Sequence, residues 1–280
     1  MSLTKLVKSI LRRLFFARFL LIPYRFYRGV KYYGNVPGKI IKWTLTSKEI
    51  TNLTYELTEL NKQYLAWFVA TVTQTDVEKV KEYIVELENN ENLKKHIRET
   101  TLKSDLSFIA DLDAKYGRRL GWYAFVRIKK PKVVVETGID KGLGSVVLAT
   151  ALMKNTEEGF PGHLYCTEIN PDAGYLLKEE PFSKYGTIIY GDSIETLQKF
   201  DKQIDILITD SNHSQDYEYG EYETVKDKLT INSLIISDTA DESSKLLEFA
   251  QQMNWNFLFF KEETKDTFFL GAGIGVAYKS

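Results

Sequence analysis

The sequence predicts an α/β fold: a doubly wound, mostly parallel sheet with a C-terminal antiparallel hairpin, preceded by a helical N-terminal region. Short apolar runs alternate with helical patterns over residues 133–253, as expected when helices connect parallel strands. Two further apolar runs, 255–260 and 267–278, follow with no room for a helix between them. We expect these two runs to pair as antiparallel neighbours.

The first 45 residues form a basic segment. Residues 1–48 contain eleven Lys or Arg and no Asp or Glu, although the net charge of the whole chain is −1. Apolar residues recur in this segment at helical spacing, and Lys5, Lys8 and Arg12 fall on another face. A basic amphipathic helix of this kind is typical of the membrane interface.

The partner of this segment stays open between an anionic membrane surface and a protein surface, which would be the chain's own domain or a second subunit reached through residues 1–33. Aromatic residues follow the basic helix without a recognised nucleic-acid motif, so nucleic acid is disfavoured. No run of about 18 apolar residues exists, so no spanning helix is predicted. One cysteine, Cys166, excludes an intrachain disulfide and fits a cytoplasmic protein, with a peripheral place at the membrane as the alternative.

Residues 46–117 contain no strand pattern and are expected to form a helical cap before a domain at 118–280. Thr46 and Glu49 form a capping box that predicts a helix through Leu60. A second capping box predicts another helix. The remaining helices of this region are expected over residues 75–88, 93–100 and 106–115.

The stretch Val133–Ser145 (VVVETGIDKGLGS) predicts the opening strand, turn and helix of the sheet. An apolar run leads into Glu136, and Ser145 begins an apolar helical pattern. Three glycines lie between them: Gly138, Gly142 and Gly144. Glycines allow positive φ and a close approach to a ligand, and the helix start presents free N–H groups to it. This unit therefore predicts a nucleotide-type site.

Polar side chains end every predicted parallel strand. Strands are expected over residues 133–136, 163–169, 187–190, 204–209 and 233–237. The residues at their ends are Glu136, Glu168, Asp192 with Ser193, Asp210 and Asp238. Ligands of such sheets bind beyond the carboxyl ends, whereas a core needs no carboxylates there. We expect Glu168 to accept hydrogen bonds from ribose hydroxyls, and Asp192 from an adenine amino group.

The motifs VVVETGIDKGLGS, YGDS and ITDSNH, in this order with Glu168 between the first two, resemble class I S-adenosylmethionine-dependent methyltransferases, which have a Rossmann-like sheet. The turn is looser than the dinucleotide-binding G-x-G-x-x-G. DSNHS, an acid-rich helix and LIISDT resemble the subgroup of cephalosporin hydroxylase-like proteins and macrolide or sugar O-methyltransferases. The resemblance covers residues 118–280. It implies S-adenosylmethionine as cofactor and O-methylation of a small-molecule, glycan or lipid-linked acceptor.

The resemblance also implies roles for single residues. Those expected at the methionine part of the cofactor are Glu136, Gly138, Gly142 and Ser145. Glu168 would hold the ribose, and Asp192 with Ser193 the adenine end. Relatives bind a divalent metal through acids that correspond to Asp210 and Asp238, which would suit Mg²⁺.

Two departures from the relatives leave open whether this chain binds a metal. Asn212 and Ser237 stand where relatives often have further acids. His213 then becomes a candidate general base beside Asp210, because its pKa lies near neutrality, unless it only ties the loop to the next helix. The tyrosine-rich helix at 216–222 (DYEYGEY) either lines an acceptor pocket or presents a solvated acidic face.

Three other functions remain as alternatives. A nicotinamide or nucleotide-sugar enzyme is disfavoured by the loose turn and the terminal hairpin, and an iron hydroxylase by only three histidines. The third is a non-catalytic binding protein on the same fold, tethered by its basic N-terminus.

Overall fold

The computed structural model describes residues 5–8, 19, 21–34, 36–50, 54–113 and 115–279. The chain divides into two compact units, and each is described by itself. The first holds residues 1–47 with Asp266–Phe268, and the second holds the rest. The expected domain boundaries near residues 45 and 117 stay predictions.

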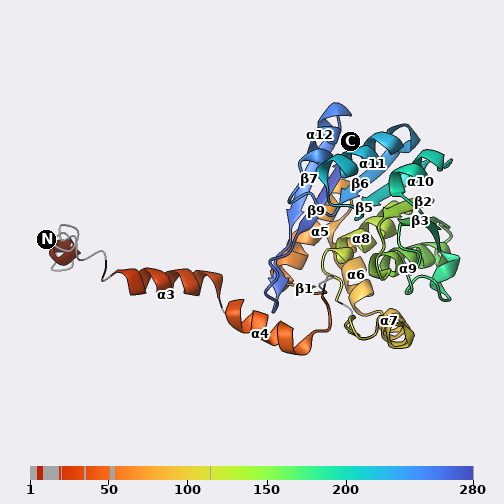
Figure 1. Ribbon diagram of the computed structural model, residues 1–280. Helices are drawn as coiled ribbons and strands as arrows, with labels where there is room; N and C mark the ends of the chain where they lie inside the picture. Colours follow the sequence, from red (N-terminus) through yellow and green to blue (C-terminus); the bar gives the residue numbers. More distant parts are fainter. Residues whose placement is uncertain are drawn as a thin grey trace. The chain divides into compact units, whose positions relative to one another are not determined.

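A seven-stranded sheet forms the centre of the second unit (Figure 1). Its strands are β2 (Val133–Thr137), β3 (His163–Glu168), β4 (Gly186–Tyr190), β5 (Ile204–Thr209), β6 (Leu229–Ser237), β7 (Asn256–Lys261) and β9 (Gly273–Tyr278). The strand order is β4-β3-β2-β5-β6-β9-β7, and the first five are parallel. Strand β9 runs antiparallel to both β6 and β7. The predicted fold class and its terminal hairpin are confirmed.

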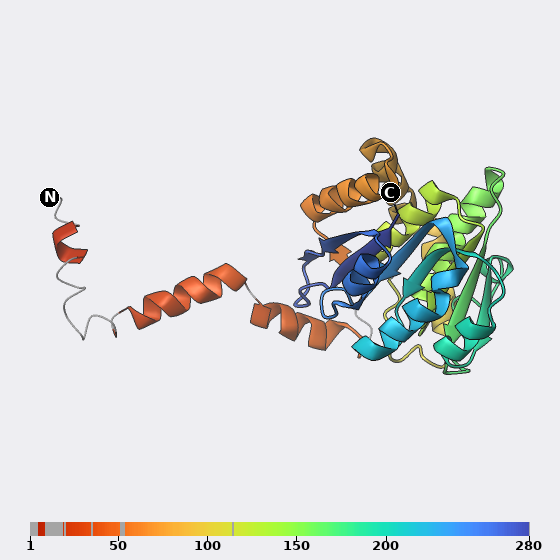
Figure 2. The ribbon, with the colours of Figure 1, turned by 90° about the horizontal axis from the view of Figure 1, so that it is seen from above.

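Helices cover both faces of the sheet (Figure 2). One face carries α5 (Glu59–Thr73), α6 (Val77–Glu88), α7 (Glu91–Lys103), α8 (Arg119–Lys129) and α9 (Leu143–Glu157). The other carries α10 (Ser193–Lys199), α11 (Gln215–Val225) and α12 (Lys245–Gln252). Short 3₁₀ turns lie at Phe182–Lys184 and Lys226–Lys228. Alternate strand residues serve the two faces, because Val134 packs in one hydrophobic cluster and Val135 in the other.

The expected helix that begins at Thr46 is wrong. Strand β1 (Glu56–Leu57) lies in that stretch and pairs with β8 (Thr264–Lys265), a distant partner that the local pattern could not reveal. Helix α5 then begins after Thr58, whose hydroxyl accepts a hydrogen bond from the backbone N–H of Asn61. The helix expected over residues 106–115 is also absent, since the described residues there form turns and bends.

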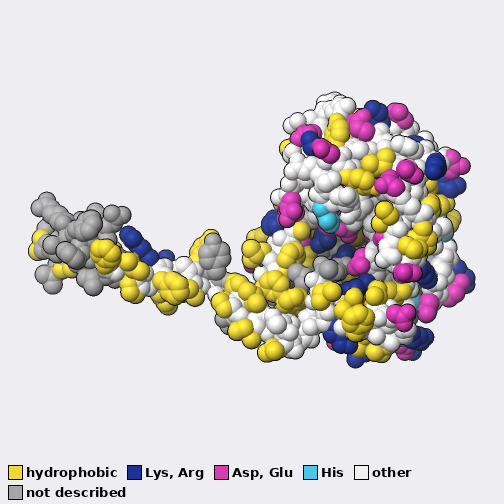
Figure 3. All heavy atoms as spheres, in the orientation of Figure 1, with side chains coloured by type: hydrophobic (Ala, Val, Ile, Leu, Met, Phe, Trp, Pro, Cys, Tyr) yellow, Lys and Arg dark blue, Asp and Glu magenta, His cyan; other side chains and the backbone are white. Residues whose placement is uncertain are grey.

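The first unit contains α3 (Ile22–Tyr33) and α4 (Val36–Thr46). Most of the predicted amphipathic helix at residues 3–14 lies outside the described residues; residues 5–8 are helical. Hydrophobic side chains are exposed along α3 and α4 (Figure 3). Among the described residues, no helix has both the length and the hydropathy needed to cross a bilayer.

Candidate functional site

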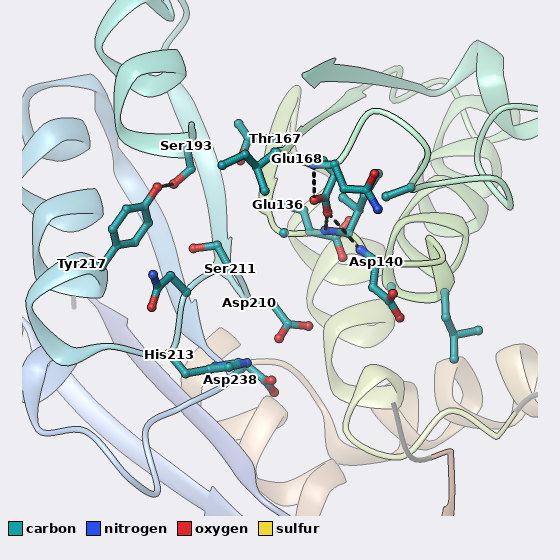
Figure 4. A pocket seen from close by; sticks show the side chains of 18 of the residues that line it. Glu136, Asp140, Thr167, Glu168, Ser193, Asp210, Ser211, His213, Tyr217 and Asp238 are labelled. Carbon is teal, nitrogen blue, oxygen red and sulfur yellow. Dashed lines mark hydrogen bonds between the residues drawn. The ribbon is translucent and has the colours of Figure 1, made fainter. Parts of the chain in front are cut away.

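A cavity of about 700 Å³ opens at the carboxyl ends of β2 to β6, within the second unit (Figure 4). Eight of the predicted site residues line it: Glu136, Gly138, Glu168, Asp192, Ser193, Asp210, His213 and Asp238. Residues separated by up to about a hundred positions in the chain therefore meet at one place. This convergence follows from the parallel strands, whose carboxyl ends share one edge of the sheet.

Gly138 brings the glycine turn against the loop after β5. Its φ is +77°, and a Cβ placed there would lie 2.6 Å from the Cα of Ser211 and still closer to the carbonyl oxygen of Asp210. Its backbone N–H donates to the carbonyl oxygen of Thr167 at 2.9 Å. A larger residue would push the turn away from the sheet edge, so the glycine sets the position of the cavity floor.

Glu168 holds the glycine turn in place. Its Oε2 accepts hydrogen bonds from the backbone N–H groups of Ile139 and Asp140, at 3.0 and 3.2 Å, and its Oε1 accepts from Asn170 at 2.9 Å. A carboxylate oxygen has further acceptor capacity, so Glu168 can still accept from a ligand hydroxyl. The carboxylate thus orders the turn and faces the cavity at once.

Glu136 is a buried carboxyl group at the end of β2, with 1% of its surface exposed. Ser145 donates to its Oε2 at 2.5 Å. Burial raises the pKa of Glu136 to about 7, and the bond from Ser145 and the charge of Arg119 oppose this increase. Gly144 leaves room for this carboxyl, because a Cβ there would meet Glu136 Oε1.

Two predicted cofactor contacts do not line the cavity. Ser145 is fully buried under Glu136, so it positions that carboxyl instead of facing a ligand. Gly142 precedes α9 with φ +92°, and a Cβ there would lie 3.5 Å from Gly174 and from Leu176. The turn therefore buries Gly142 against the loop after β3.

Asp192 and Ser193 begin α10 on the third side of the cavity. Asp192 Oδ1 accepts from the backbone N–H of Glu195 at 3.0 Å, and its Oδ2 accepts from the Tyr217 hydroxyl at 2.7 Å. These two bonds lower the pKa of Asp192. Ser193 Oγ lies 2.9 Å from the same tyrosine oxygen. Asp192 is thus a helix N-cap as well as a cavity residue.

Helix α11 turns two of its acids inward, so the alternative of a fully solvated acidic face is wrong. Glu218 and Glu221 are 3% and 1% exposed. Hydroxyl groups at three strand ends donate to Glu221: Thr137, Ser193 and Ser211. Burial raises the pKa of Glu221 to about 7. Tyr217, from the same helix, lines the cavity, as the other interpretation of this helix expected.

Arg118, which the sequence did not single out, pairs with the acid at the end of β6. Its Nη2 donates to Asp238 Oδ2 at 2.5 Å, its Nε faces Asp238 Oδ1, and its Nη1 donates to the Tyr55 hydroxyl at 3.0 Å. Asp210 lies beside Asp238, close enough for the two carboxyls to hydrogen-bond. Burial, and then the neighbouring Asp238, raise the pKa of Asp210 well above its usual range.

The Mg²⁺ site expected at Asp210 and Asp238 does not fit these residues. Arg118 covers both oxygens of Asp238. Among the described residues, no group of three or more His, Cys, Asp or Glu side chains is placed to hold a metal ion. Asn212 and Ser237 are also engaged: Asn212 accepts from Ser214, and Ser237 donates to Glu218. The guanidinium of Arg118 supplies the positive charge that the neighbouring acids Asp210 and Asp238 need.

His213 lies at the rim of the cavity, on the exposed loop after β5 (Figure 4). No hydrogen bond from another described side chain holds its ring. The ring is therefore available to a ligand in the cavity, and the role of His213 as a base or as a tie between the loop and α11 stays a prediction.

Comparison with known families agrees with this geometry. Residues 135–239 match the family model described as a methyltransferase domain. The matched segment holds all the predicted site residues, and the predicted resemblance to methyltransferases is confirmed over these residues. No significant match was found among curated proteins.

Solved structures share the fold at low sequence identity. The cofactor-bound protein Rv0187 from MTB has a TM-score of 0.52 and 13% identity, over 66% of this chain and 89% of its own. The 'putative O-methyltransferase' from Klebsiella pneumoniae has a TM-score of 0.52 and 13% identity, over 71% of this chain and 95% of its own. A methyltransferase from Geobacter sulfurreducens has a TM-score of 0.50 and 16% identity, over 69% of this chain and 92% of its own. These likenesses confirm the Rossmann-like fold.

Proposed function

Because residues 135–239 match a family model described as a methyltransferase domain, we propose that this chain uses S-adenosylmethionine to methylate an oxygen of a small-molecule or glycan acceptor. One observation carries the proposal. The glycine turn, Glu168 and Asp192 line one part of a single cavity, and Asp210, His213 and Asp238 line the part across from them. A cofactor and an acceptor can therefore meet in it.

The residues on the glycine-turn side fit the cofactor. Gly138 and Glu168 form a concave turn edge, and acids stand at the ends of β2, β3 and β4. Glu168 has acceptor capacity left for ribose hydroxyls, and Asp192 with Ser193 lies where the adenine end would reach. S-adenosylmethionine supplies an activated methyl group when it is bound.

The residues across the cavity would bind and deprotonate the acceptor. His213 has an unrestrained ring at the rim and is the proposed base. Asp210, whose pKa is raised, would accept a hydrogen bond from the acceptor hydroxyl and orient it. Positioning accounts for much of the rate when the transferred group is already activated, so no metal is needed in this scheme.

Calorimetry with S-adenosylhomocysteine tests the proposed function. We expect one molecule to bind per chain, and we expect NAD to give no heat under the same conditions. The Glu168→Ala variant should bind S-adenosylhomocysteine more weakly, because it loses both the ribose partner and the bonds that order the turn. If S-adenosylhomocysteine does not bind to the wild-type chain, the proposed function is contradicted.

The basic N-terminus supports a second, separate proposal: α3 lies at an anionic membrane surface. Ile22, Phe26 and Val30 are 52%, 72% and 47% exposed and recur four residues apart, so they share one face. Arg25, Arg28 and Lys31 fall on the opposite face, and the whole segment lacks acids. Apolar burial beside a cationic face is what an interfacial helix needs.

Sedimentation with vesicles tests the membrane proposal. The full chain should bind vesicles that contain phosphatidylserine and should not bind neutral vesicles. Deletion of residues 1–33 should abolish vesicle binding, and the shortened chain should still bind S-adenosylhomocysteine. A concentration-dependent dimer in light scattering, without vesicle binding, would instead assign the segment to a second subunit. The cytoplasmic location stays a prediction.

A further inference from the structure

Arg119 is a buried cation that faces the cavity. It belongs to the first turn of α8, is 5% exposed and lines the cavity together with Glu136 and Gly144. Its Nε is buried without a hydrogen-bond partner. Its guanidinium lies 5.5 Å from the centre of the Trp122 ring, within the range of a cation–π interaction.

Other arginines near this helix differ from Arg119. Arg118 pairs with Asp238, and Arg127 pairs with Glu86 and Glu158. For Arg119, no carboxylate of the described residues lies within ion-pair distance. A buried guanidinium is almost always paired, so a missing anion is expected where this one opens into the cavity.

The position of Arg119 indicates which anion it receives. Its charge acts on both Glu136 and Asp210, so it stands near the first strand end and also near the end of β5. An acid and a guanidinium that line the same cavity, beyond ion-pair distance of each other, complement an α-amino acid, whose ammonium and carboxylate carry opposite charges. The planar fork of arginine matches a carboxylate through two parallel hydrogen bonds.

We propose that Arg119 binds the α-carboxylate of the cofactor's methionine part, with Glu136 beside the ammonium group. This inference rests on the proposed function, since it takes S-adenosylmethionine as the ligand. It adds a residue outside the glycine motif and outside the matched segment 135–239. The amino-acid end of the cofactor would thus lie under the start of α8, and its ribose would lie beside Glu168.

Calorimetry with two ligands tests this assignment. S-adenosylmethionine and its decarboxylated form differ only in the carboxylate. The wild-type chain should bind the first at least about tenfold more tightly. Arg119→Met should weaken the binding of S-adenosylmethionine by about 10- to 100-fold, as for loss of a charge-assisted bidentate pair, and should leave the decarboxylated ligand within about twofold.

Arg98→Met is the matched control. Arg98 lies on α7 with 55% of its side chain exposed, pairs with Asp113 and does not line the cavity. The Arg98→Met variant should bind both ligands as tightly as the wild type does. Arg119→Lys keeps the charge and loses the fork, so its affinity for S-adenosylmethionine should lie between those of wild type and Arg119→Met.

The outcomes separate this inference from the proposed function. If the wild-type chain binds neither ligand, the proposed function fails and the inference fails with it. If it binds both ligands equally, the cofactor proposal stands and the carboxylate assignment is overturned. An equal loss for both ligands in Arg119→Met also overturns it, because a residue that only supports the fold would act that way. Should Arg119→Met not fold, the wild-type comparison still decides.

Discussion

The two sides of the cavity hold their acids in different ways. On the turn side (the glycine turn and the ends of β2, β3 and β4), Glu168 and Asp192 accept hydrogen bonds from backbone N–H groups. On the arginine side (the ends of β5 and β6), Asp238 depends on Arg118, which is 120 residues away in the chain. Backbone N–H donors remain when most side chains are substituted. The arginine side should therefore be the more fragile, since the ion pair of Asp238 depends on one side chain, that of Arg118.

Removing Arg118 should give the largest effect. Arg118→Met would leave Asp238 without its ion-pair partner next to Asp210, and it also removes a donor to Tyr55. Breaking a buried ion pair from one side costs about 3–5 kcal/mol, so urea unfolding should show a loss in that range. The surface pair of Arg98 and Asp113 gives the scale for comparison, because Arg98→Met should cost at most about 1 kcal/mol. Equal losses in the two variants would erase the contrast between the sides.

The buried carboxyl of Glu136 should give an effect of similar size on the turn side, visible only as pH dependence. Its pKa is raised from 4.5 to about 7, so the folded state favours the protonated form. That stabilisation is full below pH 4.5 and is lost as the pH rises through about 7. A shift of this size corresponds to roughly 3 kcal/mol.

Urea unfolding across this pH range checks the prediction. Relative to wild type, Glu136→Gln should lose less free energy of unfolding between about pH 4.5 and pH 8, because the amide does not titrate. Glu179→Gln, at an exposed position outside the cavity, should follow the wild-type curve. If Glu136→Gln also follows that curve, the buried carboxyl is not the source of the pH dependence.

The difference in stability between a pair of glycine variants should be the smallest of these effects, and it measures how closely the two sides touch. Both Gly138 and Gly159 have positive φ, so alanine costs about 1–2 kcal/mol of strain at each. At Gly159 a Cβ meets nothing within 4 Å, whereas at Gly138 it meets the backbone of Asp210 and Ser211. Gly138→Ala should therefore cost about 1–3 kcal/mol more than Gly159→Ala.

Binding completes that comparison. Gly138→Ala should weaken S-adenosylhomocysteine by more than about tenfold in calorimetry, and Gly159→Ala should not change it. Variants that are equally stable and bind equally well would mean that the contact between turn and loop has no consequence.

The turn side could be predicted from the sequence because its interactions are local. The apolar run before Glu136 and the glycines after it are adjacent in the chain, and short apolar runs between helical patterns located the other strands. The same locality caused errors. Ser145 belongs to the motif and was expected at the ligand, whereas only packing shows that it lies under Glu136. The helix expected from Thr46 failed because strand pairing with residues 264–265 overrode a local capping signal.

The arginine side could not be predicted from local patterns. Arg118 reaches Asp238 and Tyr55 through tertiary contacts that no spacing rule encodes. Two adjacent arginines at the start of the apolar stretch that forms α8 were the available signal, because charged residues beside a buried helix need partners. The expected Mg²⁺ followed from a resemblance at the strand ends, and the resemblance contained no information about Arg118.

Glu221 imposes a constraint on how this chain can diverge. One carboxylate receives hydroxyl hydrogen bonds from three separate strand ends, at Thr137, Ser193 and Ser211. Loops beyond those points can change in length and composition without disturbing it, whereas loss of any one hydroxyl leaves a buried acceptor short of a donor. We therefore expect homologous chains to diversify the cavity wall while they retain a small hydroxyl residue at each of the three positions. The preference for a methyl acceptor could then change while the hydrogen bonds to Glu221 stay the same.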